Sequence, residues 1–396
     1  MRQGSADLAA PDLARLEAAG ARIREVFAKA GYEAVDPAIL QPANVFLDRY
    51  GEDIRRRIFV FDDPGGAELC LRPDLTIPTC RLYLAAYAPA APCRLSYQGP
   101  AFRFEASASG RPSEFREAGI ECFALADREA ADAEVMGLAL GALRAAGISE
   151  VAAEIGDVAL FGALVDTLDM PPQWRTRMKR QFWKPDRFAA LTARLADAGN
   201  QGERGAPGGT ARGPAFLTAL GVLSEDDARA VVADVLALAD IAPVGGRSVE
   251  EIAERFLEQA ADASAASLSL EAAALIDRFL KIRGRPDKAL DEIAALLGKG
   301  GEVARALTRA RRRLDLLVKA GLALDRTQFS TSFGRGLEYY TGFVFEVRGA
   351  GGAALAGGGR YDNLLTELGA REAVPAVGCT VRMERLLAAL GEGGAP

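Results

Sequence analysis

Four short segments of this chain carry the charged and aromatic side chains that could bind or transform a ligand. LRPDLTIPTCR places Asp74 and Thr76 directly after a stretch of strand character. GPAFRFEASASGRPSEFREAGIECFA is hairpin-like, RGLEYYTGFVFEV joins an arginine to two adjacent tyrosines, and VGCTVRMERL adds an acidic and basic pair. The charged and aromatic candidates in these last three segments are Arg103, Glu105, Arg111, Glu117, Glu121, Arg335, Tyr339, Tyr340, Arg382, Glu384 and Arg385.

These residue types predict a pocket for a zwitterionic amino acid with a planar side chain. Arg103 and Arg335 could hold a carboxylate or a phosphate through paired N–H···O bonds. Tyr339 and Tyr340 could frame a flat ring, and the glycines of 357–359 would let the backbone form one wall. Acidic side chains, with Thr76 beside them, could accept hydrogen bonds from an ammonium group and from a ring N–H. These acidic residues are Asp74, Glu117 and Glu121.

Each candidate also has a purely structural explanation. Arg103 and Glu105 alternate along a strand and could form an ordinary surface ion pair. A tyrosine pair often lies half in the core and half at the surface. Glu384 beside Arg385 carries little information alone. The order and combination of the four segments, rather than any one of them, therefore favours a binding site.

The composition narrows the chemistry. The 396 residues contain no histidine, which excludes imidazole bases, Ser–His and Cys–His pairs and histidine-containing metal sites. The five cysteines are scattered without CxxC spacing, so we expect reduced core thiols of a cytoplasmic protein, with no metal and no cofactor. A net charge of −6 offers no general attraction to nucleic acid. No stretch approaches the roughly twenty apolar residues of a membrane span.

Hydrophobic spacing predicts a helix from Pro11 to Gly31 and another over 132–147. The β-type stretches IFVFDD, AELCLRPD, CRLSYQGPAFRFEA and EAGIECFAL lie close together, which favours antiparallel pairing. A long helical region then precedes the return of strand character. We therefore predict an α+β fold with one antiparallel sheet flanked by helices, built from 1–155 and 321–396 and interrupted by a mainly helical insertion over 156–320.

An arginine-rich stretch, RARRRLDLL, lies near the end of the predicted insertion. Its spacing indicates a helix, and we expect the arginines to form the solvated face of that helix. Docking of a partner protein is the alternative.

The four segments together resemble the class II aminoacyl-tRNA synthetases, and histidyl-tRNA synthetase in particular. FRFE…GRPSEFREAGIE resembles the second motif of that superfamily, and VGCTVRMERL resembles the third. RGLEYYTGFVFEV is similar to the histidine-specific signature, and AGGGRYDNLL to the glycine loop that follows it. GYEAVDPAIL lies where the dimer-forming first motif belongs. The resemblance covers 10–150 and 325–390, and it implies the class II synthetase-like sheet fold.

The resemblance also implies a role for each candidate. Asp74, Thr76 and Glu117 correspond to contacts with the amino group of histidine. Glu121 and Tyr340 correspond to recognition of its ring, with Tyr339 beside it. The two arginines of the predicted pocket correspond to the carboxylate end. The implied histidine-binding residues are Asp74, Thr76, Arg103, Glu117, Glu121, Arg335, Tyr339 and Tyr340. The implied remnants of an ATP site are Glu105, Arg111, Arg382 and Arg385.

The chain departs from the synthetase pattern at four points. It ends shortly after Arg385, where a histidyl-tRNA synthetase continues into an anticodon-binding domain, so we expect no such domain. Arg382 replaces the glycine beside ATP, and Ser113 stands where a phosphate-facing arginine belongs. Glu117 replaces a glutamine and keeps an acceptor for an ammonium group. The amino-acid contacts thus survive, whereas the contacts with ATP and tRNA are eroded.

This pattern is similar to that of the regulatory subunits of ATP phosphoribosyltransferase. The resemblance implies a non-catalytic subunit that binds histidine and activates and feedback-regulates the short-form catalytic subunit in the first step of histidine biosynthesis. It further implies a homodimer within a hetero-oligomer. One alternative is a truncated histidyl-tRNA synthetase paralogue that activates histidine with ATP for a non-tRNA acceptor. A nucleic-acid-binding regulator is a third possibility, which the acidic charge disfavours.

Overall fold

The computed structural model divides the chain into two compact units. The first unit comprises Met1–Thr167 and Ile276–Pro396, and the second is Leu168–Leu275. Within the described residues, no helix has both the length and the apolar character needed to cross a membrane. The described residues are 7–47, 55–106, 112–183, 188–189, 191–192, 227, 230–231, 234–235, 268–298, 300–334 and 339–392.

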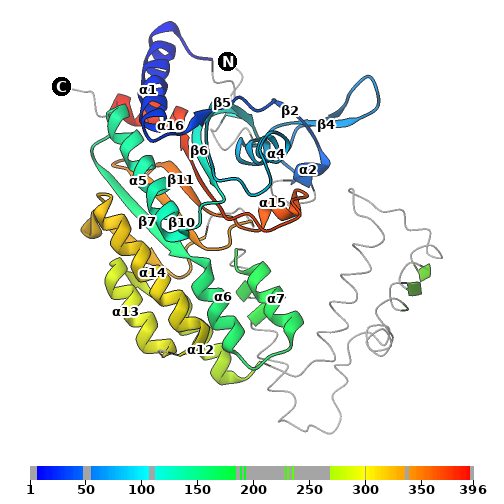
Figure 1. Cartoon of the computed structure of the whole chain (residues 1–396), viewed down its shortest axis with the longest axis vertical. Helices are drawn as coiled ribbons and strands as arrows, with labels where there is room; N and C mark the ends of the chain where they lie inside the picture. Colours follow the sequence, from blue (N-terminus) through cyan, green and yellow to red (C-terminus); the bar gives the residue numbers. More distant parts are fainter. Residues whose placement is uncertain are drawn as a thin grey trace. The chain divides into compact units, whose positions relative to one another are not determined.

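A sheet with nine strands among the described residues forms the core of the first unit (Figure 1). Its six central strands are antiparallel, in the order β5, β6, β12, β11, β10 and β7. At the edges β1 pairs with β5 and β9 pairs with β7 in parallel, and β8 pairs with β9. The predicted antiparallel sheet is therefore confirmed at its centre. The strands are β1 Glu33–Ala34, β5 Cys93–Phe102, β6 Glu114–Phe123, β7 Val151–Asp157, β8 Arg283–Gly284, β9 Thr327–Ser330, β10 Phe343–Gly349, β11 Ala354–Arg360 and β12 Ala376–Arg382.

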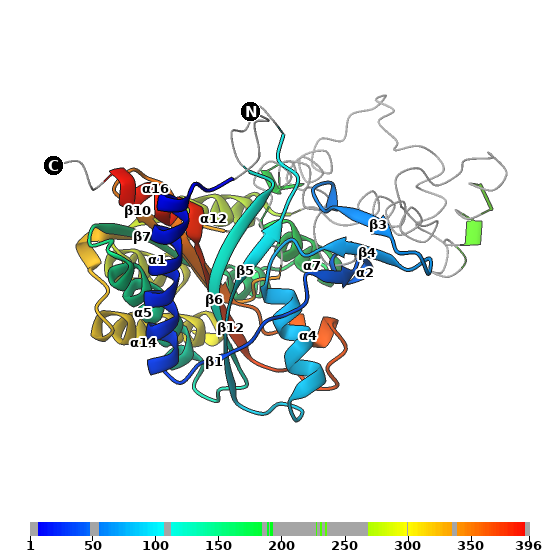
Figure 2. The same ribbon diagram turned by 90° about the horizontal axis from the view of Figure 1, so that it is seen from above.

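Helices flank both sides of this sheet. α1 packs against α5, β5 and β6, and α4 lies on the opposite side of β5 and β6 (Figure 2). A smaller sheet of β2, β4 and β3 stands apart from the large one. The remaining elements of this unit are α1 Ala10–Lys29, α2 Asn44–Leu47, α4 Thr76–Ala86, α5 Arg128–Ala146, α6 Val158–Thr167, α13 Pro286–Leu297, α14 Gly301–Lys319, α15 Leu364–Glu367, α16 Met383–Glu392, the short 3₁₀ helix Leu324–Arg326, and strands β2 Leu40–Pro42, β3 Val60–Asp62 and β4 Glu68–Leu71. In the second unit α7 spans Pro172–Gln181, and α12, Leu270–Leu280, crosses the boundary between the units.

Both predicted helices are present, and their end residues explain where they begin and end. The side chain of Asp127 accepts a hydrogen bond from the Ala130 amide at 3.1 Å and so caps the start of α5. Gly147, with φ of 108°, ends α5 in the left-handed conformation that favours glycine. Gly31, with φ of 82°, follows α1 in the same way.

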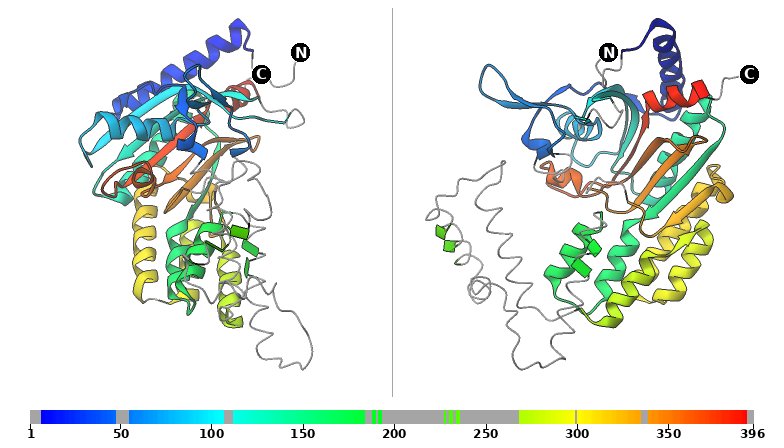
Figure 3. Two further views of the ribbon diagram at one scale, coloured as in Figure 1. Left: turned by 90° about the vertical axis from the view of Figure 1, so that its right-hand side faces the viewer. Right: turned by 180° about the vertical axis from the view of Figure 1, so that it is seen from behind.

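Helices α13 and α14 lie side by side (Figure 3) and belong to the first unit, although they fall inside the predicted insertion. The insertion itself stays a prediction. The expectation that the arginines of α14 are solvated is wrong for Arg313, which is only 4% exposed. Arg313 bonds to Asp132 and Asp157, which lie 181 and 156 residues away in sequence, so nothing near it in the chain signals its burial.

The two faces of the central sheet differ in composition. Side chains alternate along each strand, and residues paired across two strands share a face. α5 covers one face, where the Cys379 thiol lies 3.8 Å from the Val135 carbonyl; we call it the helix face. The register assigns mostly glycines and polar residues to the opposite face, which we call the pocket face. Its residues on β5, β6, β11 and β12 include Tyr97, Gly99, Glu117, Gly119, Glu121, Gly357, Gly359, Gly378, Thr380 and Arg382.

Candidate ligand pocket

Glu121, on β6, lies at the centre of the pocket face and is 0% exposed. The phenol of Tyr97 donates to its Oε1 at 3.1 Å, and the phenol of Tyr361 donates to its Oε2. Gly378 faces Glu121 across the β6–β12 pair, and a Cβ at that position would lie 1.6 Å from Oε2. Because any other residue would collide with the carboxylate, glycine at 378 makes this arrangement possible.

Burial raises the pKa of Glu121 to about 8, even though hydrogen bonds from Tyr361, Thr76 and Tyr97 act to lower it. The nearby carboxyl of Asp74 raises it further. A buried carboxylate with neutral donors lacks a compensating positive charge. Glu121 is therefore suited to accept a hydrogen bond from a cationic or N–H-bearing ligand.

Asp74 immediately precedes the first turn of α4 and is 4% exposed. Its Oδ1 accepts a hydrogen bond from the Ile77 amide at 3.1 Å. Its Oδ2 is buried and has no hydrogen-bond partner within the part of the chain that the structure describes. Burial raises the pKa of Asp74 to about 7, Arg103 lowers it, and Glu117 raises it. An unsatisfied carboxylate oxygen in this position is an acceptor to which a ligand could donate.

Arg103 follows β5 and lies in the same electrostatic neighbourhood as Asp74. Its Nε donates to the Pro73 carbonyl at 2.7 Å, and its guanidinium carbon lies 5.2 Å from the centre of the Phe115 ring. These contacts hold the positive charge of Arg103 near the start of α4. The structure thus brings together Asp74, Thr76, Arg103, Glu117 and Glu121, as the sequence predicts; Arg335 lies outside the described residues.

The predicted tyrosine pair reaches the same face. Tyr339 and Tyr340 are buried, with ring centres 4.9 Å apart. The ring of Tyr339 meets Tyr361 edge-on, with centres 5.7 Å apart and planes at 79°. A Cβ on Gly359 would lie 2.9 Å from the ring of Tyr340, so the bare backbone of β11 makes room for it. The aromatic wall therefore consists of three tyrosines, one of which also bonds to Glu121.

The positions assigned to a former ATP site have protein partners. Glu105 forms an ion pair with Arg57 and receives no ligand-like role from the structure. Arg385 donates from Nη1 to the Ala354 carbonyl at 3.2 Å. Arg382 stands directly opposite Glu117 in the β6–β12 pair, which places both on the pocket face. Arg111 lies outside the described residues.

Glu384 is also occupied within the protein. Its two carboxylate oxygens accept from the Arg116 amide at 2.8 and 2.9 Å. Burial raises the pKa of Glu384, whereas the bond from this amide lowers it.

Three pocket residues were missed by the sequence interpretation: Tyr97, Tyr361 and Thr380. Tyr97 donates to Glu121 and also lies 3.0 Å from the Thr380 hydroxyl. A signal existed for two of them, because Tyr97 lies in a predicted strand and Tyr361 ends the glycine stretch AGGGRY. Their convergence on Glu121 depends on the strand register, which the sequence does not specify.

Comparison with known proteins identifies the family to which the chain belongs. The family model for histidyl-tRNA synthetase matches residues 4–206 and 229–386. The ATP phosphoribosyltransferase regulatory subunit of Brucella anthropi is 37% identical over 369 residues, which cover 91% of this chain and 94% of its own. The chain belongs to this family of histidyl-tRNA synthetase-like regulatory subunits. The counterpart from Brucella ovis is 37% identical over 370 residues and covers the same shares, 91% and 94%.

Solved structures show the same fold. An ATP phosphoribosyltransferase regulatory subunit/histidyl-tRNA synthetase from Bacillus halodurans superimposes with a TM-score of 0.67 at 23% identity, covering 98% of this chain and 82% of that chain. A histidine–tRNA ligase subunit from Alicyclobacillus acidocaldarius gives 0.59 at 24% identity, covering 99% and 97%. At these identities the likeness concerns the fold alone. The predicted α+β class II synthetase-like fold and the family resemblance are both confirmed.

Proposed function

We propose that this family member is a non-catalytic regulatory subunit that binds histidine as its effector. In this proposal it activates and feedback-regulates the short-form ATP phosphoribosyltransferase catalytic subunit in the first step of histidine biosynthesis. The observation that carries the histidine-binding part is the pair of buried carboxyls in the pocket. Among the described residues, Glu121 is held by two phenols and has no counter-charge, and Asp74 has a buried oxygen without a hydrogen-bond partner.

The chemistry of histidine matches these two acceptors. Its ammonium group would donate to Oδ2 of Asp74, with Thr76 and Glu117 nearby. Its ring N–H would donate to Glu121, with Tyr339 and Tyr340 against the ring faces or edges. We assign its carboxylate to Arg103 and Arg335. These remain our assignments, and each predicts a loss on truncation of the side chain.

Titration calorimetry with histidine tests the pocket directly. We expect one site per chain in the unmodified protein and heat too small to fit with Asp74→Asn, because an amide cannot replace the charge that the ammonium group needs. Glu150→Gln, at an exposed position paired with Arg326, is the matched control and should bind like the parent. Equal affinity in the Asp74→Asn protein would contradict the assignment.

Ligand analogues separate the two ends of the pocket. Alanine keeps the ammonium and carboxylate groups but lacks the ring, and histidinol keeps the ring and ammonium group but lacks the carboxylate. If Glu121 reads the ring, Glu121→Gln should reduce the preference for histidine over alanine. A preference unchanged by this substitution would remove Glu121 from ring recognition.

The regulatory role requires a catalytic partner. We propose that the chain forms a homodimer within a hetero-oligomer with that partner. A catalytic partner is in line with its relatives, which are regulatory subunits of ATP phosphoribosyltransferase. The partner's phosphoribosyl transfer, measured with and without this chain and across a histidine titration, tests the role. The proposal predicts activation by the chain and inhibition by histidine, with inhibition lost for Asp74→Asn. If the chain activates the partner but histidine does not inhibit it, the proposed partner stands and the proposed role of histidine as effector is wrong.

A synthetase-type activity is the second candidate, because the matched family model describes histidyl-tRNA synthetases. In that reading the pocket would present the histidine carboxylate to ATP. The position of Arg382 on the pocket face opposite Glu117 argues against it, because a guanidinium there competes for the space and charge of a phosphate. Histidine-dependent exchange of pyrophosphate into ATP would favour this candidate; its absence, with histidine binding intact, favours regulation.

A further inference from the structure

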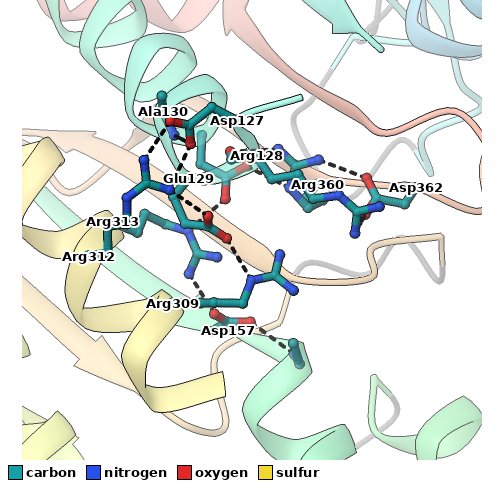
Figure 4. A network of polar contacts seen from close by, with 12 residues as sticks. Asp127, Arg128, Glu129, Ala130, Asp157, Arg309, Arg312, Arg313, Arg360 and Asp362 are labelled. Atoms are coloured by element: carbon teal, nitrogen blue, oxygen red, sulfur yellow. Dashed lines mark hydrogen bonds and ion pairs between the residues drawn. The ribbon is translucent and has the colours of Figure 1, made fainter. Parts of the chain in front are cut away.

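A buried ion-pair cluster lies on the helix face of the sheet (Figure 4). Arg313 of α14 donates to Asp132 of α5 and to Asp157 at the end of β7, both at 2.6 Å. The other oxygen of Asp132 accepts from Nε of Arg360, the last residue of β11, at 2.8 Å. All four side chains are buried, and Asp132 is 0% exposed. The Asp132 carboxylate of α5 therefore holds both α14 and the end of β11, and Arg313 links α14 in turn to Asp157 of β7.

Arg360 uses its whole guanidinium in this cluster. Besides Asp132 it bonds through Nη1 to Asp362 at 2.8 Å and through Nη2 to the Arg128 carbonyl at 2.9 Å. Asp362 in turn accepts from the Ala376 amide of β12 at 3.0 Å and pairs with Arg128 at 3.2 Å. The guanidinium group of Arg360 is planar and bonds to several acceptors. These bonds fix the direction of the side chain and of the backbone that carries it.

Tyr361 stands between these two anchored residues and points the other way. Its phenol donates to Glu121 in the pocket, while its amide donates to the Ala376 carbonyl at 2.8 Å. The carbonyl of Arg360 accepts from the Thr341 amide at 2.8 Å, which fixes the same stretch of backbone from the side of β10. The orientation of the Tyr361 phenol is thus determined by a backbone whose neighbours on both sides are held on the helix face.

We propose that Arg360 is a positioning residue for the ligand pocket: it anchors the end of β11 to Asp132 and thereby holds the Tyr361 phenol against Glu121. This inference deepens the proposed function and uses its ligand, histidine. Through Asp132 the same anchor reaches Arg313, so a displacement of α14 transmits to the carboxylate that reads the ring. A contiguous set of paired, buried groups with one preferred arrangement is the physical requirement for such coupling.

A purely structural role for Arg360 predicts a different outcome. If the cluster only stabilises the fold, replacing Arg360 lowers the free energy of unfolding and any loss of affinity is independent of Tyr361. If Arg360 acts through Tyr361, its replacement matters little once the phenol is gone. Residues that act as one unit show non-additive effects, which a double-mutant cycle measures.

The experiment is a cycle of Arg360→Met, Tyr361→Phe and the double variant in the full-length protein, read by histidine titration calorimetry. We expect each single variant to lose about tenfold in affinity, and the double variant to lose no more than about twofold beyond Tyr361→Phe. Arg326→Met, at an exposed ion pair with Glu150, is the matched control and should leave affinity unchanged. Arg360→Lys keeps the positive charge but lacks the planar guanidinium group. This variant replaces Arg360→Met in the cycle if the methionine variant fails to fold.

The outcomes are distinct. Losses that multiply to about a hundredfold in the double variant would overturn the positioning role. Unchanged affinity in both Arg360→Met and Arg360→Lys would overturn it as well. If the unmodified chain binds no histidine, the proposed function fails, and the positioning role that rests on it is overturned as well; if it binds histidine, the cycle judges the positioning role alone.

Discussion

The pocket face and the helix face of one sheet bury carboxylates in opposite ways. On the helix face Asp132 lies between two guanidiniums at 2.6 and 2.8 Å, and Asp157 completes the charge balance. On the pocket face Glu121 accepts from neutral hydroxyl groups and has no charged partner among the described residues, and an oxygen of Asp74 has no partner there either. Burying a charge is costly unless it is paired. Among the described residues, the helix face thus pairs its carboxylates with arginines, whereas the pocket face leaves acceptors for the ligand that we propose.

The largest expected effect concerns the helix face. Asp132→Ala removes the carboxylate between Arg313 and Arg360, and breaking a buried pair in this way typically costs about 3–5 kcal/mol. Chemical denaturation without ligand should show this loss in the free energy of unfolding. Asp291→Ala, at an exposed pair with Arg311, should change stability by less than about 0.5 kcal/mol. Similar losses for both variants would erase the distinction between the faces.

On the pocket face, removal of a buried carboxylate should not lower the stability of the unliganded protein, in contrast to Asp132→Ala on the helix face. Glu121→Gln removes a buried carboxylate that lacks a counter-charge, so the unliganded protein should unfold at the same or a higher denaturant concentration. Histidine affinity should fall by about 1.5–3 kcal/mol, the usual worth of a hydrogen bond to a charged group. Denaturation and calorimetry on the same variant measure both quantities. A clear loss of unliganded stability would show that Glu121 is satisfied by the protein alone.

The pH dependence should sharpen the contrast. Burial raises the pKa of Glu121 to about 8 and that of Asp74 to about 7. A raised pKa in the folded state means that these groups stabilise the unliganded protein at low pH, and that this contribution is lost as pH rises through about 7 to 8. Bound histidine favours the ionised carboxyls. The increase in melting temperature at a fixed histidine concentration should therefore be larger at pH 8 than at pH 6.5.

This pH effect has a matched control. One released proton changes the binding free energy by about 1.4 kcal/mol per pH unit, so the difference between the two pH values should be measurable by thermal denaturation. The Glu121→Gln protein should show a flatter profile. An increase that is equal at both pH values in the unmodified protein would indicate that the carboxyls are already ionised before the ligand binds.

The smallest expected effect lies at the exposed rim of the helix-face cluster. Arg312 pairs with Asp127 and Glu129 at 2.5 and 3.0 Å, but its side chain is half exposed. Arg312→Met should cost at most about 1 kcal/mol of stability, because solvent and salt screen such pairs. Histidine affinity should not change. A loss comparable with that of Arg313→Met at its buried neighbour would show that exposure does not separate the two arginines.

The sequence predicted the α+β fold, and the pocket assignments stay predictions; strand register explains which contacts the sequence could not reveal. Glu121 and the tyrosine pair were identified from their types and order, because glycine, acidic and aromatic residues alternate along recognisable strands. The partners of Glu121 were not, because Tyr97 and Tyr361 are brought to it by pairing between strands that are distant in the chain.

Two further residues show the same limit. Arg313 was assigned to solvent because its helix is strongly amphipathic and basic, and its carboxylate partners lie more than 150 residues away in sequence. Glu105 stays a predicted remnant of an ATP site, and the sequence did not reveal its ion pair with Arg57, 48 residues earlier. The sequence shows which residues are charged, but which of them form ion pairs depends on the tertiary structure.

The glycines of the pocket face have an evolutionary consequence. At Gly378, Gly119 and Gly359 a single added carbon would meet Glu121, Tyr97 or Tyr340 at less than 3 Å. Every missense change of a glycine codon adds at least that carbon. No substitution at these positions therefore avoids the steric conflict. A single mutation at any of these positions would therefore displace Glu121, Tyr97 or Tyr340, and smaller adjustments to this face must come from other residues.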